Sequence, residues 1–373
     1  MDNVQVTWRD GTLYTEYSWH QLSPYIGRMK SSMARSLITQ FTEQGDTVYD
    51  PFSGAGTIAL EAWIAGRHVL AGDLSPYAYV LSKAKVNPPR NLEDAERRLD
   101  MCWLEASQER EKVDLRRIPK WVRRFFHPET LREALAIRNV TLHRRQYFLL
   151  CCLLGILHHW RPGFLSYPSS HTVPYLKDKL FPRTSYPQLY AYRAIYPRLL
   201  AKVRRAFKRT PKVDRQLARK VTQSDATKFP TVLHSHKISA IITSPPYMNA
   251  LSYARDNRLR LWFLGIKDHT ALEPAISPRK RQFLNIMETL LSLWSELLAK
   301  DGACILVLGA VRRDGKSHCL PEEILNIARN KRCGLKPTAV CKNSIPDIRS
   351  ARINCRSTRE ETILSVQEGE IMA

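Results

Sequence analysis

A glycine-rich turn between two short apolar runs limits the fold of this chain more than any other sequence feature. Residues 47–52 (TVYDPF) are β-branched and aromatic, and they lead into residues 53–57 (SGAGT). Residues 58–65 read as a short helix that stops at a glycine, and residues 68–73 (HVLAGD) form a second apolar run that ends in the carboxylate of Asp73. The order strand, tight turn, helix, strand is typical of parallel sheets, so we expect a doubly wound α/β fold.

The same turn is suited to binding a nucleotide-like ligand. Gly54 and Gly56 allow the backbone to approach a ligand closely, and the following helix offers free N–H groups at its N-terminus. Asp73 stands 17 residues after Gly56, close to the spacing at which an acid holds a ribose diol. Gly54, Gly56 and Ala59 also fit the dinucleotide pattern G-x-G-x-x-A, so a nicotinamide or flavin enzyme remains an alternative, as does a turn without a ligand.

A second motif carries the reaction chemistry. Residues 237–243 (KISAIIT) read as a buried strand that runs directly into Ser244-Pro245-Pro246-Tyr247. The two prolines fix a rigid turn, in which the Ser244 hydroxyl and the Pro245 carbonyl could each accept an N–H of an exocyclic amine while Tyr247 stacks on the base. Those hydrogen bonds would shift the delocalised amine towards a tetrahedral nucleophile that can attack a methyl group. A turn that merely ends a strand is the structural alternative.

Positive charge is concentrated in one part of the chain. The formal net charge is +23, and residues 116–220 alone hold an excess of 20 basic over acidic residues, with the densest run at 202–220. A single basic run is ordinarily a solvated helix face, but an excess this long, interleaved with aromatic residues, favours a polyanion, and double-stranded DNA is the expected partner. The expected DNA-binding residues are Lys202, Arg204, Arg205, Lys208, Arg209, Lys212, Arg215 and Arg255.

Two further segments could take part. Residues 164–175 (FLSYPSSHTVPY) are expected to form an ordered loop, with DNA contact as the alternative. Residues 248–265 read as a helix whose Leu, Trp and Phe side chains belong to the core, while Tyr253 and Arg255 could line a base pocket or contact the backbone.

Taken together, the motifs resemble the amino-group DNA methyltransferases that use S-adenosyl-L-methionine. Residues 50–57 look like their cofactor loop, Asp73 like their ribose acid, and residues 243–247 like their catalytic turn. The resemblance implies a Rossmann-like methyltransferase fold, here with a helical basic insertion. Residues 20–36 resemble the segment that closes over the methionine part, Asp225 resembles the acid that meets the adenine amine, and residues 358–364 the final strand.

The resemblance also implies the roles of individual residues. The expected catalytic residues are Ser244, Pro245, Pro246 and Tyr247. The expected cofactor-binding residues are Tyr25, Lys30, Asp50, Pro51, Phe52, Ser53, Gly54, Gly56, Thr57, Asp73, Leu74, Asp225 and Ala226.

The target base follows from the residue before the two prolines. In the family, serine at this position goes with cytosine N4, whereas aspartate or asparagine goes with adenine N6. Ser244 therefore predicts methylation of the N4 amine of a cytosine flipped out of duplex DNA, with adenine N6 or an RNA base as alternatives. Cytosine C5 chemistry needs a thiolate, usually after a proline, and none of the eight cysteines follows one. A restriction-modification role would make a cognate restriction endonuclease a candidate partner.

Composition divides the chain into three parts. Residues 1–88 are expected to form the first part of the catalytic domain, residues 89–220 the insertion, and residues 221–373 the second part. The longest apolar stretch, 147–157, is too short to span a membrane, so a cytoplasmic protein associated with the nucleoid through DNA is expected. There is no Cys-x-x-Cys pair, so we expect reduced structural cysteines and no metal site.

Overall fold

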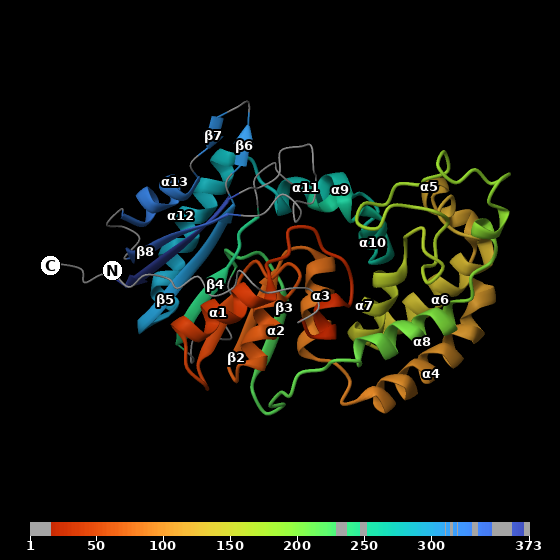
Figure 1. The fold of residues 1–373 in the computed structure, drawn as a ribbon, viewed down its shortest axis with the longest axis horizontal. Coiled ribbons are helices and arrows are strands. Elements are labelled where there is room, and N and C mark those ends of the chain that lie inside the picture. Colours follow the sequence, from red (N-terminus) through yellow and green to blue (C-terminus); the bar gives the residue numbers. More distant parts are fainter. Residues whose placement is uncertain are drawn as a thin grey trace.

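The computed structural model describes residues 16–228, 237–246, 252–309, 311–313, 316–318, 320–329, 335–344 and 360–368. These residues form an α/β part built on a seven-stranded sheet and a helical part beside it (Figure 1). Two short strands outside this sheet, β6 (Val311–Arg313) and β7 (Lys316–His318), pair with each other in antiparallel fashion.

The large sheet has the strand order β3-β2-β1-β4-β5-β9-β8. The first five strands in this order pair in parallel, whereas β9 runs antiparallel to both β5 and β8. The strands are β1 (Thr47–Asp50), β2 (His68–Asp73), β3 (Arg219–Gln223), β4 (Ile238–Thr243), β5 (Leu298–Gly309), β8 (Leu335–Ser344) and β9 (Glu360–Glu368). The expected doubly wound, Rossmann-like α/β fold is confirmed.

Different helices cover the two faces of the sheet, because side chains of a strand alternate between its faces. Val48 and Ala240 belong to the core cluster of one face, and Tyr49 and Ile241 belong to that of the other. The first cluster includes α1 (Ser31–Phe41), α2 (Thr57–Ile64) and α3 (Pro76–Val86), and the second includes α12 (Lys280–Leu297) and α13 (Leu320–Arg329). With both faces covered, the strand ends are the part of the sheet that a ligand can reach.

The strand order reverses at β1, which has β2 on one side and β4 on the other. In open α/β sheets a ligand binds in the crevice at such a switch point, outside the carboxyl ends of the strands. The pairing of Val48 with Ala240 and of Tyr49 with Ile241 sets the register of this crevice.

The βαβ unit predicted from the sequence is present, with small differences at the ends of its elements. β1 ends at Asp50, before the expected residue 52, and α2 begins at Thr57. Gly66 takes a positive φ of 82° and ends the helix, and β2 has the bounds expected for residues 68–73.

Gly56 is required by packing inside the protein. Its φ is +68°, and a Cβ at this position would lie 2.7 Å from the Ser82 Cα on α3. Gly54, with φ +46°, lies against the ring of Tyr25 instead, where a Cβ would be 3.3 Å from Cε1. The two glycines of the turn therefore serve different contacts.

The helical part follows α3 and shares its core with the α/β part. Its helices are α4 (Leu92–Glu109), α5 (Lys120–Arg123), α6 (Pro128–His143), α7 (Tyr147–Ile156) and α8 (Ile195–Ala206), with short 3-10 turns at Arg110–Lys112, Leu115–Arg117 and Pro187–Tyr190. The apolar α7 is almost wholly buried and packs against α3. The division at residues 88 and 220 stays a prediction, although β3 begins at Arg219 and so includes the last two residues assigned to the insertion.

Of the helix expected over residues 248–265, residues 248–251 lie outside the described residues, and the rest is divided. α9 (Tyr253–Asp256) and α10 (Arg258–Phe263) are separated at Asn257, and α11 (His269–Ile276) follows. Leu259, Leu261 and Phe263 are buried, as expected for core residues. In the part of the chain that the structure describes, no helix is both long and apolar enough to cross a membrane.

We predict that Gly56→Ala destabilises the protein by about 2–4 kcal/mol, because left-handed backbone strain adds to the clash with α3. Gly45→Ala is the matched control: its φ is +86°, but no atom lies within 4 Å of the added Cβ. The control should lose only about 1 kcal/mol from backbone strain. Urea unfolding of both variants measures the difference, and equal losses would contradict the packing role of Gly56.

Candidate active site

A pocket opens at the carboxyl ends of four neighbouring strands. The loop after β1 contributes Asp50 to Ala55, and the loops after β2, β3 and β4 contribute Asp73 to Ser75, Asp225 with Ala226, and Ser244 with Pro246. The remaining wall comes from the segment before α1, from α2 and α9, and from α11, α12 and the turn between them. The residues are Tyr25, Gly27, Arg28, Met29, Thr57, Ile58, Tyr253, Ala275, Ile276, Pro278, Phe283 and Ile286. The cofactor loop and the Ser-Pro-Pro turn, almost 190 residues apart, thus face one cavity.

Most of the residues expected to bind a cofactor line this pocket. Lys30 and Gly56 do not line it: Lys30 directly precedes α1, and Gly56 faces α3. Pro245 is buried beside the lining residues Ser244 and Pro246, and Tyr247 lies outside the described residues. The residues that do line the pocket are Tyr25, Asp50, Pro51, Phe52, Ser53, Gly54, Thr57, Asp73, Leu74, Asp225 and Ala226.

Asp73 fastens the glycine turn to the end of β2. Its Oδ2 accepts the Gly54 N–H at 2.8 Å, and its Oδ1 accepts the Ser75 N–H at 2.8 Å. Burial raises the pKa of Asp73 to about 6, against the opposing effect of these two N–H groups. Each carboxylate oxygen has a second lone pair, so Asp73 can also accept hydroxyl groups of a ligand.

Asp50 connects the ends of β1 and β4. It is 2% exposed, and its Oδ1 accepts the Thr243 hydroxyl at 2.7 Å and the Phe52 N–H at 3.3 Å. Burial raises the pKa of Asp50 to about 7, and the nearby charge of Asp73 adds to the shift. Because Thr243 directly precedes Ser244, this hydrogen bond holds the Ser-Pro-Pro turn against the glycine turn.

Tyr25 lies over the glycine turn as part of an aromatic cluster. Its ring centroid is 5.9 Å from that of Tyr77 and 6.2 Å from that of Tyr253. The Tyr77 hydroxyl donates to the Pro24 carbonyl at 2.6 Å, which ties this segment to α3. Burial raises the pKa of Tyr25 well above its ordinary value, so the ring is a neutral, largely apolar wall.

One polar atom of the pocket wall has no hydrogen-bond partner among the described residues. Thr57, at the start of α2, is 3% exposed, and its Oγ1 makes no hydrogen bond with any described residue. Buried hydroxyl groups are normally paired, so this one is available to a ligand group at the helix N-terminus. Across the pocket, Asp225 Oδ1 accepts the backbone N–H and the hydroxyl of Thr227, both at 2.9 Å.

Sequence reasoning missed much of the apolar wall. Ile276, Phe283 and Ile286 line the pocket from α11 and α12. No motif marks these residues, because a helix that crosses the end of a sheet has the same apolar pattern as one that covers only its face. Tyr253 was a candidate from the sequence, and the structure places it in the wall.

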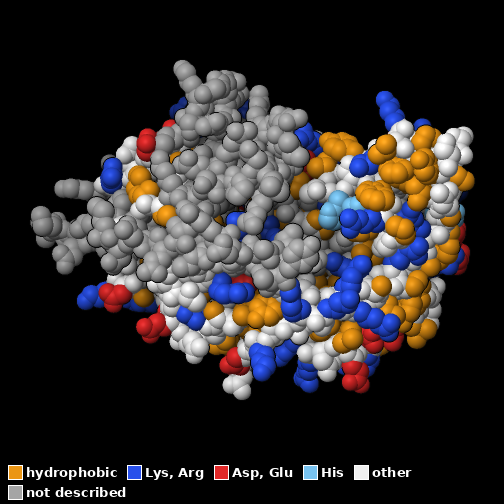
Figure 2. Space-filling model, in the orientation of Figure 1, with side chains coloured by type: hydrophobic (Ala, Val, Ile, Leu, Met, Phe, Trp, Pro, Cys, Tyr) orange, Lys and Arg blue, Asp and Glu red, His pale blue; other side chains and the backbone are white. Residues whose placement is uncertain are grey.

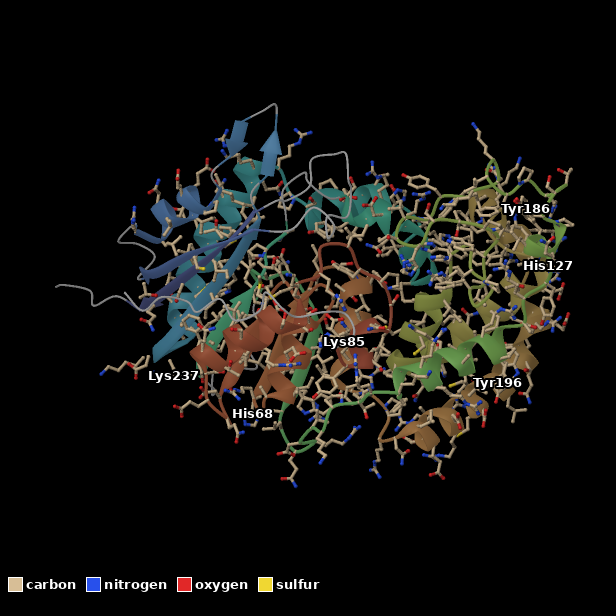
Figure 3. All side chains as sticks on the ribbon, in the orientation of Figure 1. His68, Lys85, His127, Tyr186, Tyr196 and Lys237 are labelled. Carbon is tan, nitrogen blue, oxygen red and sulfur yellow. The ribbon has the colours of Figure 1, made fainter. Side chains whose placement is uncertain are left out.

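Residues 207–220, the larger part of the dense basic run, lie at the other end of the strands, where Phe207 contacts Trp19 beside Trp63. Ala218 N–H donates to Nδ1 of His68, at the start of β2, and Figure 3 shows His68 at the lower edge of the sheet. Several of the residues expected to bind DNA instead bind groups of the protein. Lys202 donates to the Gln21 carbonyl, and Arg204 pairs with the Glu96 carboxylate. Arg209 donates to the Glu16 carbonyl, and Arg215 donates to the carbonyls of Pro88 and Pro89. Arg205, Lys208 and Lys212 are exposed. Their contact with DNA stays a prediction.

Arg255 is placed differently from the other expected DNA contacts. It is on α9, two residues after the pocket residue Tyr253, and its side chain is 48% exposed beside Asp256. Among the described residues, no group of three His, Cys, Asp or Glu side chains is placed to hold a metal ion.

A family model matches one part of the chain. The model of the D12 class N6 adenine-specific DNA methyltransferase family matches residues 25–153, about a third of the chain. The match contains the glycine turn and Asp73 and ends before Ser244. It favours the adenine alternative over the cytosine specificity that Ser244 led us to expect. The sequence matches no curated protein.

Several solved structures are similar to the chain at low identity. They include TrmN from Thermus thermophilus (11% identity, 94% of this chain and 52% of that chain, TM-score 0.39) and the rRNA methyltransferase aviRa from Streptomyces viridochromogenes (10%, 92% and 87%, 0.34). A third is the methyltransferase subunit of a type I restriction-modification system from Streptococcus thermophilus (10%, 96% and 45%, 0.34). The chain spans about half the length of the first and third of these proteins.

The raised pKa of Asp50 predicts that the stability of the folded protein depends on pH. A folded-state pKa of about 7, against an ordinary value of 3.8, means that the folded protein keeps a proton that the unfolded chain releases. The stability contributed by protonated Asp50 is therefore complete below about pH 4 and is lost as the pH rises through 7. Asp50→Asn keeps the acceptor for Thr243 and Phe52 but cannot ionise.

We expect Asp50→Asn to gain stability relative to the unaltered protein as the pH rises from 4 to 8, by on the order of 2–4 kcal/mol. Urea unfolding of both proteins at pH 4, 6 and 8 gives this difference directly. A difference that stays constant with pH would show that Asp50 is ionised in the folded protein throughout.

Proposed function

We propose that the protein is an S-adenosyl-L-methionine-dependent DNA methyltransferase that modifies the N6 amine of adenine. The observation that carries this proposal is the shared pocket, in which the Ser-Pro-Pro turn after β4 faces Asp73 and the glycine turn. The match to an adenine-N6 family over residues 25–153 supports the choice of base. Cytosine N4 is the second candidate, supported by Ser244 in the first position of the turn.

The donors and acceptors of the pocket fit the proposed cofactor. Asp73 would accept the ribose hydroxyl groups, and Asp225 would accept the adenine amine. An apolar wall for the adenine ring is supplied by Phe52, Ala226, Phe283 and Ile286. The unpartnered Thr57 hydroxyl at the start of α2 would donate to the methionine carboxylate, which the helix N-terminus also favours. Tyr25 would cover the cofactor from the side of the N-terminal segment.

The Ser-Pro-Pro turn would prepare the amine. When bound, S-adenosyl-L-methionine supplies an electrophilic methyl group. Ser244 Oγ and the Pro245 carbonyl would each accept one N–H of the target amine, which moves the nitrogen lone pair out of conjugation with the ring. The hydrogen bond from Thr243 to Asp50 keeps the turn fixed during this step, because it connects the turn to β1. Stacking of the base on Tyr247 stays a prediction.

The cofactor assignment predicts a pH dependence of binding. Hydroxyl groups donate best to an ionised carboxylate, so the affinity for S-adenosyl-L-methionine should fall as the pH drops below about 6, where Asp73 takes up a proton. Asp73→Asn should bind at least tenfold more weakly at pH 8 and lose most of this pH dependence. Calorimetric titration between pH 5 and pH 8 measures both effects. Equal affinity of the two proteins at pH 8 would remove Asp73 from the ribose site.

The reaction product decides between the candidates. Duplex DNA incubated with the protein and S-adenosyl-L-methionine, then digested to nucleosides, should contain N6-methyladenine by mass spectrometry. N4-methylcytosine would transfer the assignment to the second candidate, and methyl transfer only to RNA would reject DNA as the substrate.

Ser244 variants test the role of the turn in the same assay. Ser244→Ala should reduce kcat by about 10–100-fold and change cofactor affinity little, because its hydrogen bond strengthens as the nitrogen becomes tetrahedral. Ser244→Asn restores an acceptor and should recover part of the rate on adenine. An unchanged kcat in Ser244→Ala would exclude this serine from amine activation.

A further inference from the structure

A second cationic surface lies at the outer end of the helical part. It is formed by residues 116–124, which include α5, and by residues 157–192, which connect α7 to α8; we call it the aromatic–arginine face. Large apolar side chains are exposed on it: Trp160 by 42%, Tyr175 by 49% and Leu180 by 62%. Exposed apolar groups gathered in one region usually mark a binding surface.

The aromatic rings of this face form an ordered set. Trp160 stacks on Phe181 with centroids 6.1 Å apart and an interplanar angle of 14°, and Phe181 meets Tyr186 edge-on at 5.5 Å. Tyr186 is itself 38% exposed, and Figure 3 shows it at the outer end of the helical part. Rings held in this way lose little conformational entropy when a partner binds.

Arginine side chains accompany the rings. Arg161 lies over Trp160 at 6.0 Å, Arg258 over Tyr175 at 4.6 Å and Arg183 over Tyr190 at 5.0 Å. Figure 2 shows Lys and Arg side chains interspersed with hydrophobic ones over the helical part. Flat cations beside aromatic rings suit phosphate groups and stacked bases together.

The edge of the face next to α5 is strongly positive. Residues 116–124 contain five basic residues and no acidic residue. These side chains are exposed, and they are Arg116, Arg117, Lys120, Arg123 and Arg124. The Phe125 carbonyl accepts the Tyr167 N–H at 2.7 Å, and the Arg124 guanidinium lies 3.9 Å from the Asp178 carboxylate. This edge is therefore continuous with residues 157–192, which we call the aromatic loop.

Hydrogen bonds fix the aromatic loop to α10, the helix that follows the pocket-lining α9. The buried guanidinium of Arg260 on α10 donates to the carbonyls of His171 and Thr172 in the loop and of Leu154 on α7. Arg258 donates to the Pro174 carbonyl. α10 directly follows α9, whose Tyr253 lines the pocket. In Figure 1, α5, α9 and α11 lie along the same upper edge of the molecule, whereas α8 lies below.

We infer that DNA binds across the aromatic–arginine face, and that the basic run 202–220 is not its contact surface. The inference rests on the proposed function. A base that enters the pocket must approach from the carboxyl ends of the strands, because the duplex has to lie next to the base that it releases. The aromatic–arginine face is connected to that side through α9 and α10. Residues 207–220 instead pack at the amino ends, where Phe207 contacts Trp19 beside Trp63 and Trp63, at the far end of α2, donates to the Asp214 carbonyl at 2.6 Å.

Two variants with the same change in charge test the inference. Lys120→Gln/Arg123→Gln/Arg124→Gln removes three positive charges from the face, and Arg205→Gln/Lys208→Gln/Lys212→Gln removes three from the opposite edge. Binding of the full-length protein to a fluorescent duplex is measured between 50 and 300 mM salt. The face variant should bind at least tenfold more weakly at the lowest salt, with a logarithmic salt slope shallower by about 2–3. The opposite-edge variant should stay within twofold of the unaltered protein.

The aromatic side chains have a separate signature. Trp160→Ala and Tyr186→Ala should each weaken DNA binding about 5- to 50-fold without changing the salt slope, because stacking does not release counterions. None of the substituted residues lines the pocket, so affinity for S-adenosyl-L-methionine, measured calorimetrically, should be unchanged and reports correct folding.

The outcomes separate the inference from the proposed function. If the unaltered protein neither binds nor methylates DNA, the proposed function fails. If it methylates DNA but the two triple variants lose affinity equally, or the opposite-edge variant loses more, the aromatic–arginine face is not the DNA surface and the proposed function stands. Equal binding of the face to anionic vesicles and to DNA would overturn the assignment of its partner.

Discussion

The parallel pairing of β1 with β4 is the interaction on which the rest of the site depends. These strands lie almost 190 residues apart in sequence, and their pairing brings the glycine turn and the Ser-Pro-Pro turn to one crevice. The hydrogen bond between Thr243 and Asp50 repeats this connection at the strand ends. Burying the Asp50 carboxyl beside Asp73 disfavours its charge, so two carboxyl groups with raised pKa values stand at the centre of the pocket.

The helical part does not line the pocket, but it supports the N-terminal segment that does. A Cβ on Gly155 of α7 would overlap the Leu22 carbonyl oxygen, so α7 packs directly on the backbone of the segment that carries Tyr25. Lys202 on α8 donates to the carbonyl of the neighbouring Gln21. The same segment is held on its other side by His20, whose Nε2 lies 2.7 Å from Glu61 on α2. The helical part and the α/β part therefore hold the N-terminal segment between them.

Charge density along the sequence and charge on the surface are different quantities here. The run 202–220 has the highest density of Lys and Arg, yet several of its cations cap carbonyl groups or pair with acids where the chain returns from α8 to β3. Residues 116–124 contain fewer cations, and Arg116 and Arg117 pair with Asp114, but all five cationic side chains of this segment are exposed. A cation that binds the protein's own carbonyl groups must exchange that bond before it can bind a phosphate, so position counts for more than number.

Local sequence determined the parts of this protein that depend on neighbouring residues. The strands and helix around the glycine turn, the bounds of β2 and thirteen residues of the pocket follow from motifs, because turn conformation and apolar periodicity act over a few residues. Tertiary structure alone decided the rest. Gly56 serves the packing of α3, Phe283 and Ile286 close the pocket, and the helix after β4 divides at Asn257. Residues 207–220 of the dense basic run lie opposite the pocket. These outcomes depend on contacts between segments far apart in the chain, which no local pattern encodes.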